Sequence, residues 1–79
     1  MSELVNQARG LIHTAGEAIA ASTKEPPSAA TAMLARIIVS EAKKQRPDNL
    51  LLQSIDLDRN NLDWNDIRAA MKVVVRALG

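Results

Sequence analysis

The stretch Leu-Asp-Trp-Asn-Asp-Ile that begins at Leu62 carries nearly every signal that starts an α-helix. The Asp63 side chain can accept from the free N–H groups of a first helical turn, and Asp66 can reach back as the acid of a capping box. Leu62 and Ile67 occupy the two positions of a hydrophobic staple. The sequence therefore predicts a helix over residues 63–78.

The chain offers few ways to hold such helices together other than apolar packing. It has 79 residues, which is near the lower size at which one hydrophobic core is sufficient. The absence of cysteine excludes disulfides and thiolate metal sites, and a single histidine excludes a multi-histidine metal site within one chain. Apolar residues make up 47% of the chain, but Trp64 is the only aromatic one. We therefore expect an aliphatic, alanine-rich core, no cofactor, and a contribution from self-association.

Charge and hydropathy say little about a partner. The formal net charge of +1 is too small to indicate a polyanion. No apolar run approaches the length of a transmembrane span, and no basic segment followed by an apolar block marks a signal peptide. We expect a cytoplasmic protein that makes no use of a membrane.

A first helix is predicted from Ser2, which can act as its N-cap, to about Ala21. Apolar residues recur along it at steps of three and four, which is the helical period. Gly10 and Gly16 interrupt this pattern, and such glycines often mark the close approach of another backbone. The pair Pro26-Pro27 disfavours helical angles in the residues before it, so the helix must end there.

Two further helices follow, the second of them short. Ser28 can cap a helix that runs to about Gln45 and that Pro47 ends. Residues 50–55 suit either a short helix or a strand, and we favour the helix because no second strand exists to pair with one. Together with the last helix they predict a single all-α domain over residues 1–79. We expect a compact four-helix bundle with a short third helix and antiparallel first and second helices.

The second and last helices are apolar over more of their circumference than one core can cover. The face of the second helix that we expect in the core is Ala30, Met33, Leu34, Ile37 and Ile38, and Val39 and Ala42 widen it. Three consecutive residues span roughly 200° of a helix, so Val73, Val74 and Val75 cannot all face one core. We therefore predict a protein interface formed by residues that flank the core faces, namely Val73, Val75, Val39 and Ala35.

Two groups of basic residues are candidates for contacts with nucleic acid or an acidic partner. One group is Arg68, Lys72 and Arg76, which recur every four residues on the last helix. The other is Lys43, Lys44 and Arg46 at the end of the second helix. Basic rows are also common on solvated faces, and the chain lacks both an aromatic stacking platform and a glycine-rich phosphate loop.

Three other patterns are incomplete. Residues 56–60, Asp-Leu-Asp-Arg-Asn, open like an EF-hand calcium loop, but Asn61 replaces the glycine of the turn and Ile67 replaces the bidentate glutamate. His13 and Glu17 lie one turn apart, but no cysteine is present as a nucleophile and nothing visible orients a hydroxyl beside them. A helix-turn-helix needs a polar recognition helix, whereas the last helix has a broad apolar surface.

The sequence therefore predicts a non-catalytic helical protein-interaction module, such as a small adaptor, regulator or phage-type inhibitor. Its expected partner is a second copy of the chain, in a homodimer or a higher oligomer. A small nucleic-acid-binding regulator that uses the basic helix faces is the alternative. We expect no catalytic residue and no metal site.

Overall fold

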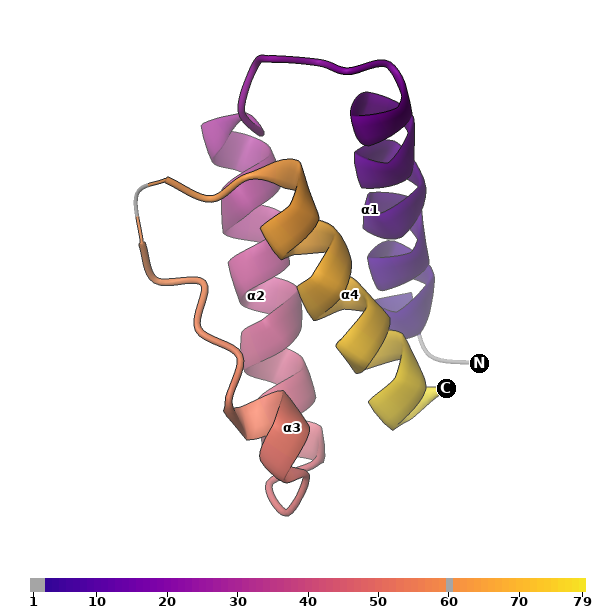
Figure 1. Cartoon of the computed structure of the whole chain (residues 1–79). Helices are drawn as coiled ribbons and strands as arrows, with labels where there is room; N and C mark the ends of the chain where they lie inside the picture. The colour runs from indigo at the N-terminus through magenta and orange to yellow at the C-terminus, as the bar shows by residue number, and fades with distance from the viewer. Residues whose placement is uncertain (1–2, 60) are drawn as a thin grey trace.

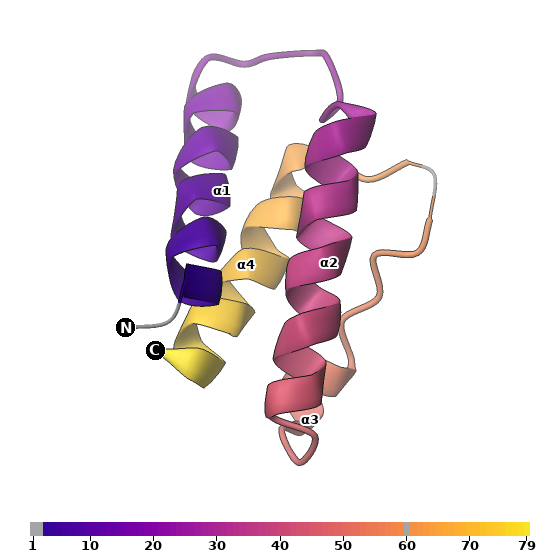
Figure 2. The same ribbon diagram turned by 180° about the vertical axis from the view of Figure 1, so that it is seen from behind.

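The structure is a computed structural model that describes residues 3–59 and 61–79 (Figures 1 and 2). It contains four helices: α1 over Glu3–Ala20, α2 over Ala29–Gln45, α3 over Leu50–Gln53 and α4 over Trp64–Leu78. The described residues include no strand. The predicted all-α bundle with a short third helix is thus confirmed. Ser2 and Asn60, which entered the predictions above, lie outside the described residues.

The two long N-terminal helices run antiparallel, and α4 lies across both of them (Figure 1). The contact between α1 and α4 is the most extensive in the molecule. After α2 the chain turns through α3 and returns along α2 in extended form to the start of α4 (Figure 1). Because the body measures 36 × 26 × 19 Å, it is about two helices thick and each helix keeps one side outward.

The end of α1 is set by a backbone motif at Ser22, which has a positive φ of 54°. The Ser22 N–H donates to the Ile19 carbonyl and the Thr23 N–H donates to the Ala18 carbonyl, both at 3.0 Å. These two bonds define a Schellman motif, which satisfies the last carbonyls of a helix. The chain then passes Pro26-Pro27 and enters α2 from the opposite direction (Figure 2).

Side-chain caps begin the other three helices, and those of α2 and α4 are the predicted residues Ser28 and Asp63. Ser28 caps α2 and Asn49 caps α3, each by accepting from the backbone N–H three residues later, at 3.2 and 3.0 Å. At α4 the Asp66 N–H donates to Asp63 Oδ1 (2.8 Å) and the Asp63 N–H donates to Asp66 Oδ2 (3.1 Å), which completes the capping box. Trp64 Nε1 donates to a backbone carbonyl of the α1–α2 loop at 3.1 Å, so it joins the start of α4 to that loop.

The core combines small side chains at the helix contacts with a few large ones. The buried alanines are Ala8 and Ala15 on α1, Ala35 and Ala42 on α2, and Ala70 on α4. The largest side chains that are completely buried are Ile38, Leu52, Ile67, Met71 and Val74. Alanine allows helix axes to come close together, because no bulky group separates the backbones. The large residues, three of them on α4, fill the space that remains.

The predicted core face of α2 is wrong for four of its five central residues, whereas Val39 and Ala42, predicted to widen it, are buried. Only Ile38 is buried; Ala30, Met33, Leu34 and Ile37 are exposed. The buried face is instead Ala35, Ile38, Val39 and Ala42, which lies about a third of a turn away. Both arcs are apolar, and the arc with the smaller residues is the one that packs.

The glycines of α1 also differ from expectation. A Cβ added at Gly10 or Gly16 would have no atom of a neighbouring element within 4 Å. Among residues 3–59 and 61–79, neither glycine therefore marks the close approach of another backbone.

The adjacent residues Ile37 and Ile38 provide a direct check of the rotation of α2, since they are 53% and 0% exposed. We expect Ile38→Ala to lower the free energy of unfolding by about 2–4 kcal/mol, because it leaves a cavity. Ile37→Ala should change it by less than about 0.5 kcal/mol, as surface substitutions usually do. Urea unfolding of both variants in dilute solution is the measurement. The reverse order of the two effects would show that α2 is rotated as the sequence had indicated.

Candidate interaction surfaces

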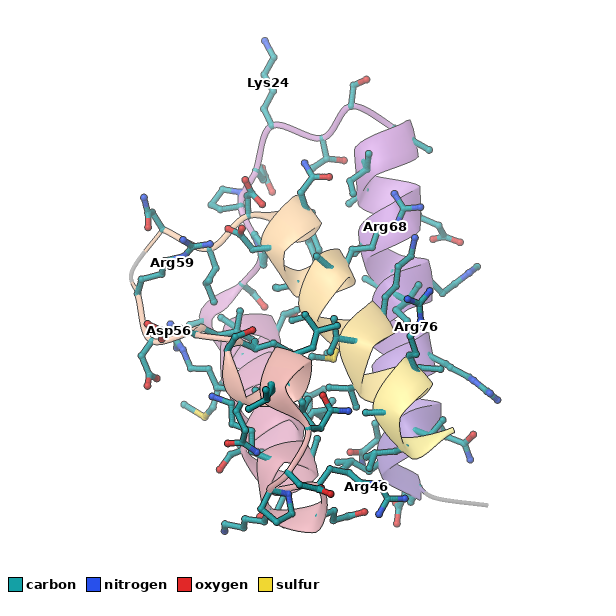
Figure 3. The ribbon with its side chains drawn as sticks, turned by 60° about the horizontal axis from the view of Figure 1, so that its bottom comes forward. Lys24, Arg46, Asp56, Arg59, Arg68 and Arg76 are labelled. Carbon is teal, nitrogen blue, oxygen red and sulfur yellow. The ribbon has the colours of Figure 1, made fainter. Side chains whose placement is uncertain are left out.

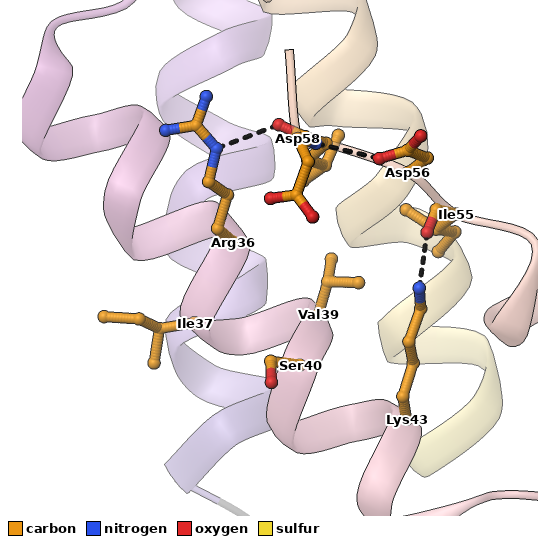
Figure 4. Close-up of a pocket in the computed structure, with 9 residues that line it drawn as sticks. Arg36, Ile37, Val39, Ser40, Lys43, Ile55, Asp56 and Asp58 are labelled. Atoms are coloured by element: carbon orange, nitrogen blue, oxygen red, sulfur yellow. Dashed lines mark hydrogen bonds between the residues drawn. The ribbon is translucent and has the colours of Figure 1, made fainter.

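An uncovered apolar row runs along the outer side of α2. It consists of Ala30, Met33, Leu34 and Ile37, which we call the α2 row. Met33 is 59% exposed, Ile37 53% and Leu34 38%. These positions recur at steps of three, one and three, so they form a continuous stripe on a helix. Figure 4 shows Ile37 directed away from the segment that returns along α2.

Charged residues lie at both ends of the α2 row. Beyond Ile37, Lys44 Nζ and Glu41 Oε1 form an ion pair of 3.3 Å, with both side chains largely in solvent. Before Ala30, the exposed loop contains Lys24 and Glu25, and Lys24 extends away from the body of the molecule (Figure 3). Each end of the row therefore carries one acid and one base.

The other flank of α2 holds the extended segment 55–59 through two bases, Arg36 and Lys43, of which Lys43 is a predicted site residue. Arg36 Nε donates to the Leu57 carbonyl (2.9 Å) and Arg36 Nη2 donates to the Arg59 carbonyl (2.8 Å). Lys43 Nζ donates to the Ile55 carbonyl at 2.6 Å (Figure 4). The three acceptors are alternate residues, as expected when an extended chain presents every second carbonyl to one side.

Arg36 and Lys43 also border a shallow groove of about 380 Å³ between α2 and this segment. Ile37 and Ser40 form one wall, and Asp56 and Asp58 lie on the other (Figure 4). Asp56 Oδ1 accepts from the Asp58 N–H at 2.9 Å, which is the local turn that an Asp residue commonly makes. The two bases are thus engaged with carbonyls, and the groove contains charges of both signs.

The predicted interface residues lie at different depths. Ala35 and Val39 are 0% and 4% exposed, so the expectation that they flank the core is wrong, and they are not part of the surface. Val74 is completely buried, while Val73 and Val75 are half-buried on either side of it and pack against the core. The physical reason is that α2 is rotated about its axis relative to the expectation. Ala35 and Val39 therefore face the core, and the α2 row faces outward.

The second basic group is divided among separate partners. Lys43 bonds to the 55–59 segment, Lys44 pairs with Glu41, and Arg46 Nε donates to the Ala77 carbonyl near the end of α4 at 3.4 Å. These three residues do not form one cationic surface.

The basic row of α4 remains intact. Lys72 and Arg76 are exposed and Arg68 is half-buried. Within residues 3–59 and 61–79, none of the three side chains makes a hydrogen bond or an ion pair. Figure 3 places Arg68 and Arg76 on the side of α4 towards α1, with Arg46 beyond the C-terminal end of the helix. The two basic groups predicted from the sequence therefore do not merge.

Two exposed leucines form a further apolar feature at the end of the molecule that contains α3. Leu50 is 84% and Leu51 58% exposed, while the next residue, Leu52, is completely buried. In Figure 2 the ribbon of α3 lies behind α2, so these leucines are carried by a different layer from the α2 row.

The remaining polar features are local. His13 Nε2 lies 2.7 Å from Glu17 Oε1, and both side chains are more than two-thirds exposed. Over the described residues, no three His, Asp or Glu side chains gather closely enough to hold a metal ion. In the same part of the chain, no helix is both long and apolar enough to cross a membrane.

The sequence analysis missed the α2 row as a surface, and one signal could have found it. The helix has two apolar arcs, and one of them contains Ala35 and Ala42 seven positions apart. Alanines at such spacing favour close helix packing, which would have placed that arc inside.

The chain matches no known protein-family model, no curated protein and no solved structure.

Removal of the Arg36 guanidinium tests its role in holding the 55–59 segment. We expect Arg36→Met to preserve the helices but to increase amide hydrogen exchange in residues 55–59, since two carbonyls lose a charged donor worth about 1–3 kcal/mol. Lys44→Met is the matched control, because Lys44 makes only an exposed ion pair. Equal exchange in the two variants would contradict the assignment.

Proposed function

We propose that this chain is a non-catalytic helical protein-interaction module that associates with a second copy of itself through the outer side of α2. The observation that carries the proposal is the α2 row: three large aliphatic side chains exposed on one helix face while alanines of the same helix are buried. Burial of such a side chain is worth about 1.5–3 kcal/mol. A small chain gains much of its stability from burial of this kind.

The overall surface supports the same proposal. The accessible area is 5144 Å², and a compact monomer of this mass is expected to have about 4,700 Å². The exposed side chains of the α2 row contribute to this area. Contiguous exposed apolar residues rimmed by polar ones are typical of interaction sites.

A single charge on the α2 row tests the proposal. We expect the unmodified chain to sediment as a dimer or larger at high micromolar concentration. Ile37→Lys should fold normally but lower the association constant by roughly a hundredfold, because the side chain is buried twice in a symmetric dimer. The matched control is Ala69→Lys, an exposed site on α4, and it should associate like the unmodified chain. A monomeric unmodified chain at that concentration would overturn the proposal and leave the α2 row as a candidate site for a different protein.

A small nucleic-acid-binding regulator remains the second candidate, favoured by one observation. Arg68, Lys72 and Arg76 point out of α4 without engaging other described side chains, so their charges are free to meet phosphates. Cations that contact phosphates release counterions, which makes binding depend on salt.

For this candidate, the triple variant Arg68→Gln, Lys72→Gln, Arg76→Gln should weaken binding to a mixed-sequence DNA duplex. The slope of log affinity against log salt should fall by about one unit for each contact removed. Lys24→Gln serves as the control, because Lys24 lies on the α1–α2 loop, away from this row. No binding of the unmodified chain to duplex or single-stranded DNA or RNA at low salt would end this hypothesis.

A further inference from the structure

Residues 55–59, which we call the strap, return along α2 without pairing to any helix through their backbone. Within residues 3–59 and 61–79, the backbone–backbone bonds of the strap are local. The Ile55 N–H donates to the Leu52 carbonyl at 3.2 Å, and the Arg59 N–H donates to the Leu57 carbonyl at 2.9 Å. The strap therefore lacks the repeated backbone bonds that join neighbouring strands of a sheet, and separate side-chain contacts hold it in place.

Polar contacts hold the strap on both sides, and those on the α2 side are the stronger. Arg36 gives two charge-assisted bonds to strap carbonyls, one of them part-buried, and Lys43 gives a third. On the α4 side, Arg59 Nη2 lies 2.6 Å from Asp66 Oδ1, and their side chains are 51% and 30% exposed. An ion pair so close to solvent contributes little to stability. Arg36 is therefore the main polar contact of the strap.

A single strap side chain reaches the core. Leu57 is 6% exposed and belongs to the buried cluster, whereas the other strap residues are exposed or half-buried. Displacement of the strap would therefore expose one large core side chain. Separation of α4 from the other helices would expose at least three, namely Ile67, Met71 and Val74. Because the free energy of opening grows with the apolar area exposed, the strap opens at a lower cost than the helices.

Open space lies along both edges of the strap. The groove on the α2 side measures about 380 Å³, and a second hollow of about 200 Å³ lies between the strap and α4. Residues 55–57 line both of them, so the strap separates the two. Val39 lines the first, and Ala70 and Val73 line the second. Displacement of the strap would join these spaces into one cleft between α2 and α4 with apolar residues from both helices.

We infer that the strap is a detachable element, which lifts from α2 and α4 as a unit while the helices stay packed. Leu57 is its apolar anchor and Arg36 its main polar contact. In the open state the cleft between α2 and α4 is continuous, and the donors of Arg36 and Lys43 are available to the carbonyls of another extended chain. This inference is independent of the self-association proposed above.

Engineered thiols test the separate opening, because the natural chain has no cysteine. Leu57→Cys places a thiol on the buried side of the strap, and Val74→Cys places one on α4 at a completely buried site. We expect a thiol reagent to label position 57 at least about tenfold faster than position 74 in the folded chain. The rate at position 57 should stay nearly constant in urea below the unfolding transition. The rate at position 74 should rise with urea, since exposure there requires separation of the helices and exposes a large area.

The urea dependence at position 57 decides the question even if Val74→Cys does not fold. A rate at position 57 that rises as steeply as global unfolding would show that the strap leaves only with the whole fold, and would overturn the inference. Immediate reaction, at the rate of the urea-unfolded chain, would show that the strap is not closed and would overturn it as well.

The role of Arg36 is tested in the same labelled chain. Addition of Arg36→Met to Leu57→Cys should raise the labelling rate by about tenfold or more, because two charge-assisted bonds are lost. Lys44→Met in the same chain is the matched control and should leave the rate unchanged, since Lys44 contacts no strap residue among the described ones. Equal rates in these two variants would refute Arg36 as the main contact. Sedimentation of the unmodified chain decides self-association separately, so the two proposals can fail independently.

Discussion

The rest of the structure depends on the close packing of α4 against α1 and α2. Buried alanines on all three helices keep the contacting surfaces flat, and Ile67, Met71 and Val74 of α4 fill the space between them. Alanine contributes little apolar area, so this arrangement obtains its stability from dense packing of a few large side chains. The same arrangement leaves apolar area exposed to solvent, because the larger residues of α2 lie on the outside.

This choice of inward face explains the distribution of the candidate sites. With Ala35 and Ala42 inside, one flank of α2 turns Arg36 and Lys43 towards the returning chain, where they bond to carbonyls of Ile55, Leu57 and Arg59. A base that satisfies backbone carbonyls in this way is a structural element. The adjoining side of α2 carries the α2 row, whose Ile37 also borders the groove beside Arg36 and Lys43. Because of the same rotation, Lys43 bonds to a backbone carbonyl and the α2 row is exposed.

The two exposed features, the α2 row and the basic row of α4, are suited to different partners. The α2 row is apolar and bounded by balanced charge, which suits a protein surface of the same composition. The basic row of α4 is a single line of three cations without stacking groups, which suits a weak and salt-sensitive contact. The exposure of three large apolar side chains on the α2 row is the reason to give it the main role. The two surfaces lie on different helices, so each can be altered without the other.

The sequence by itself determined where the helices begin and end. Ser28, Asn49 and Asp63 bond to N–H groups only three residues away, so their geometry is complete within a single turn and needs no tertiary contact. In α1 the polar residues Asn6, Arg9 and His13 recur at the helical period, and all three are exposed. Only the tertiary structure decided which arc of α2 faces the core. Met33 and Ile38 are similarly apolar, and the choice between their arcs depends on how closely α1 and α4 approach, a property of three helices together that no single helix encodes.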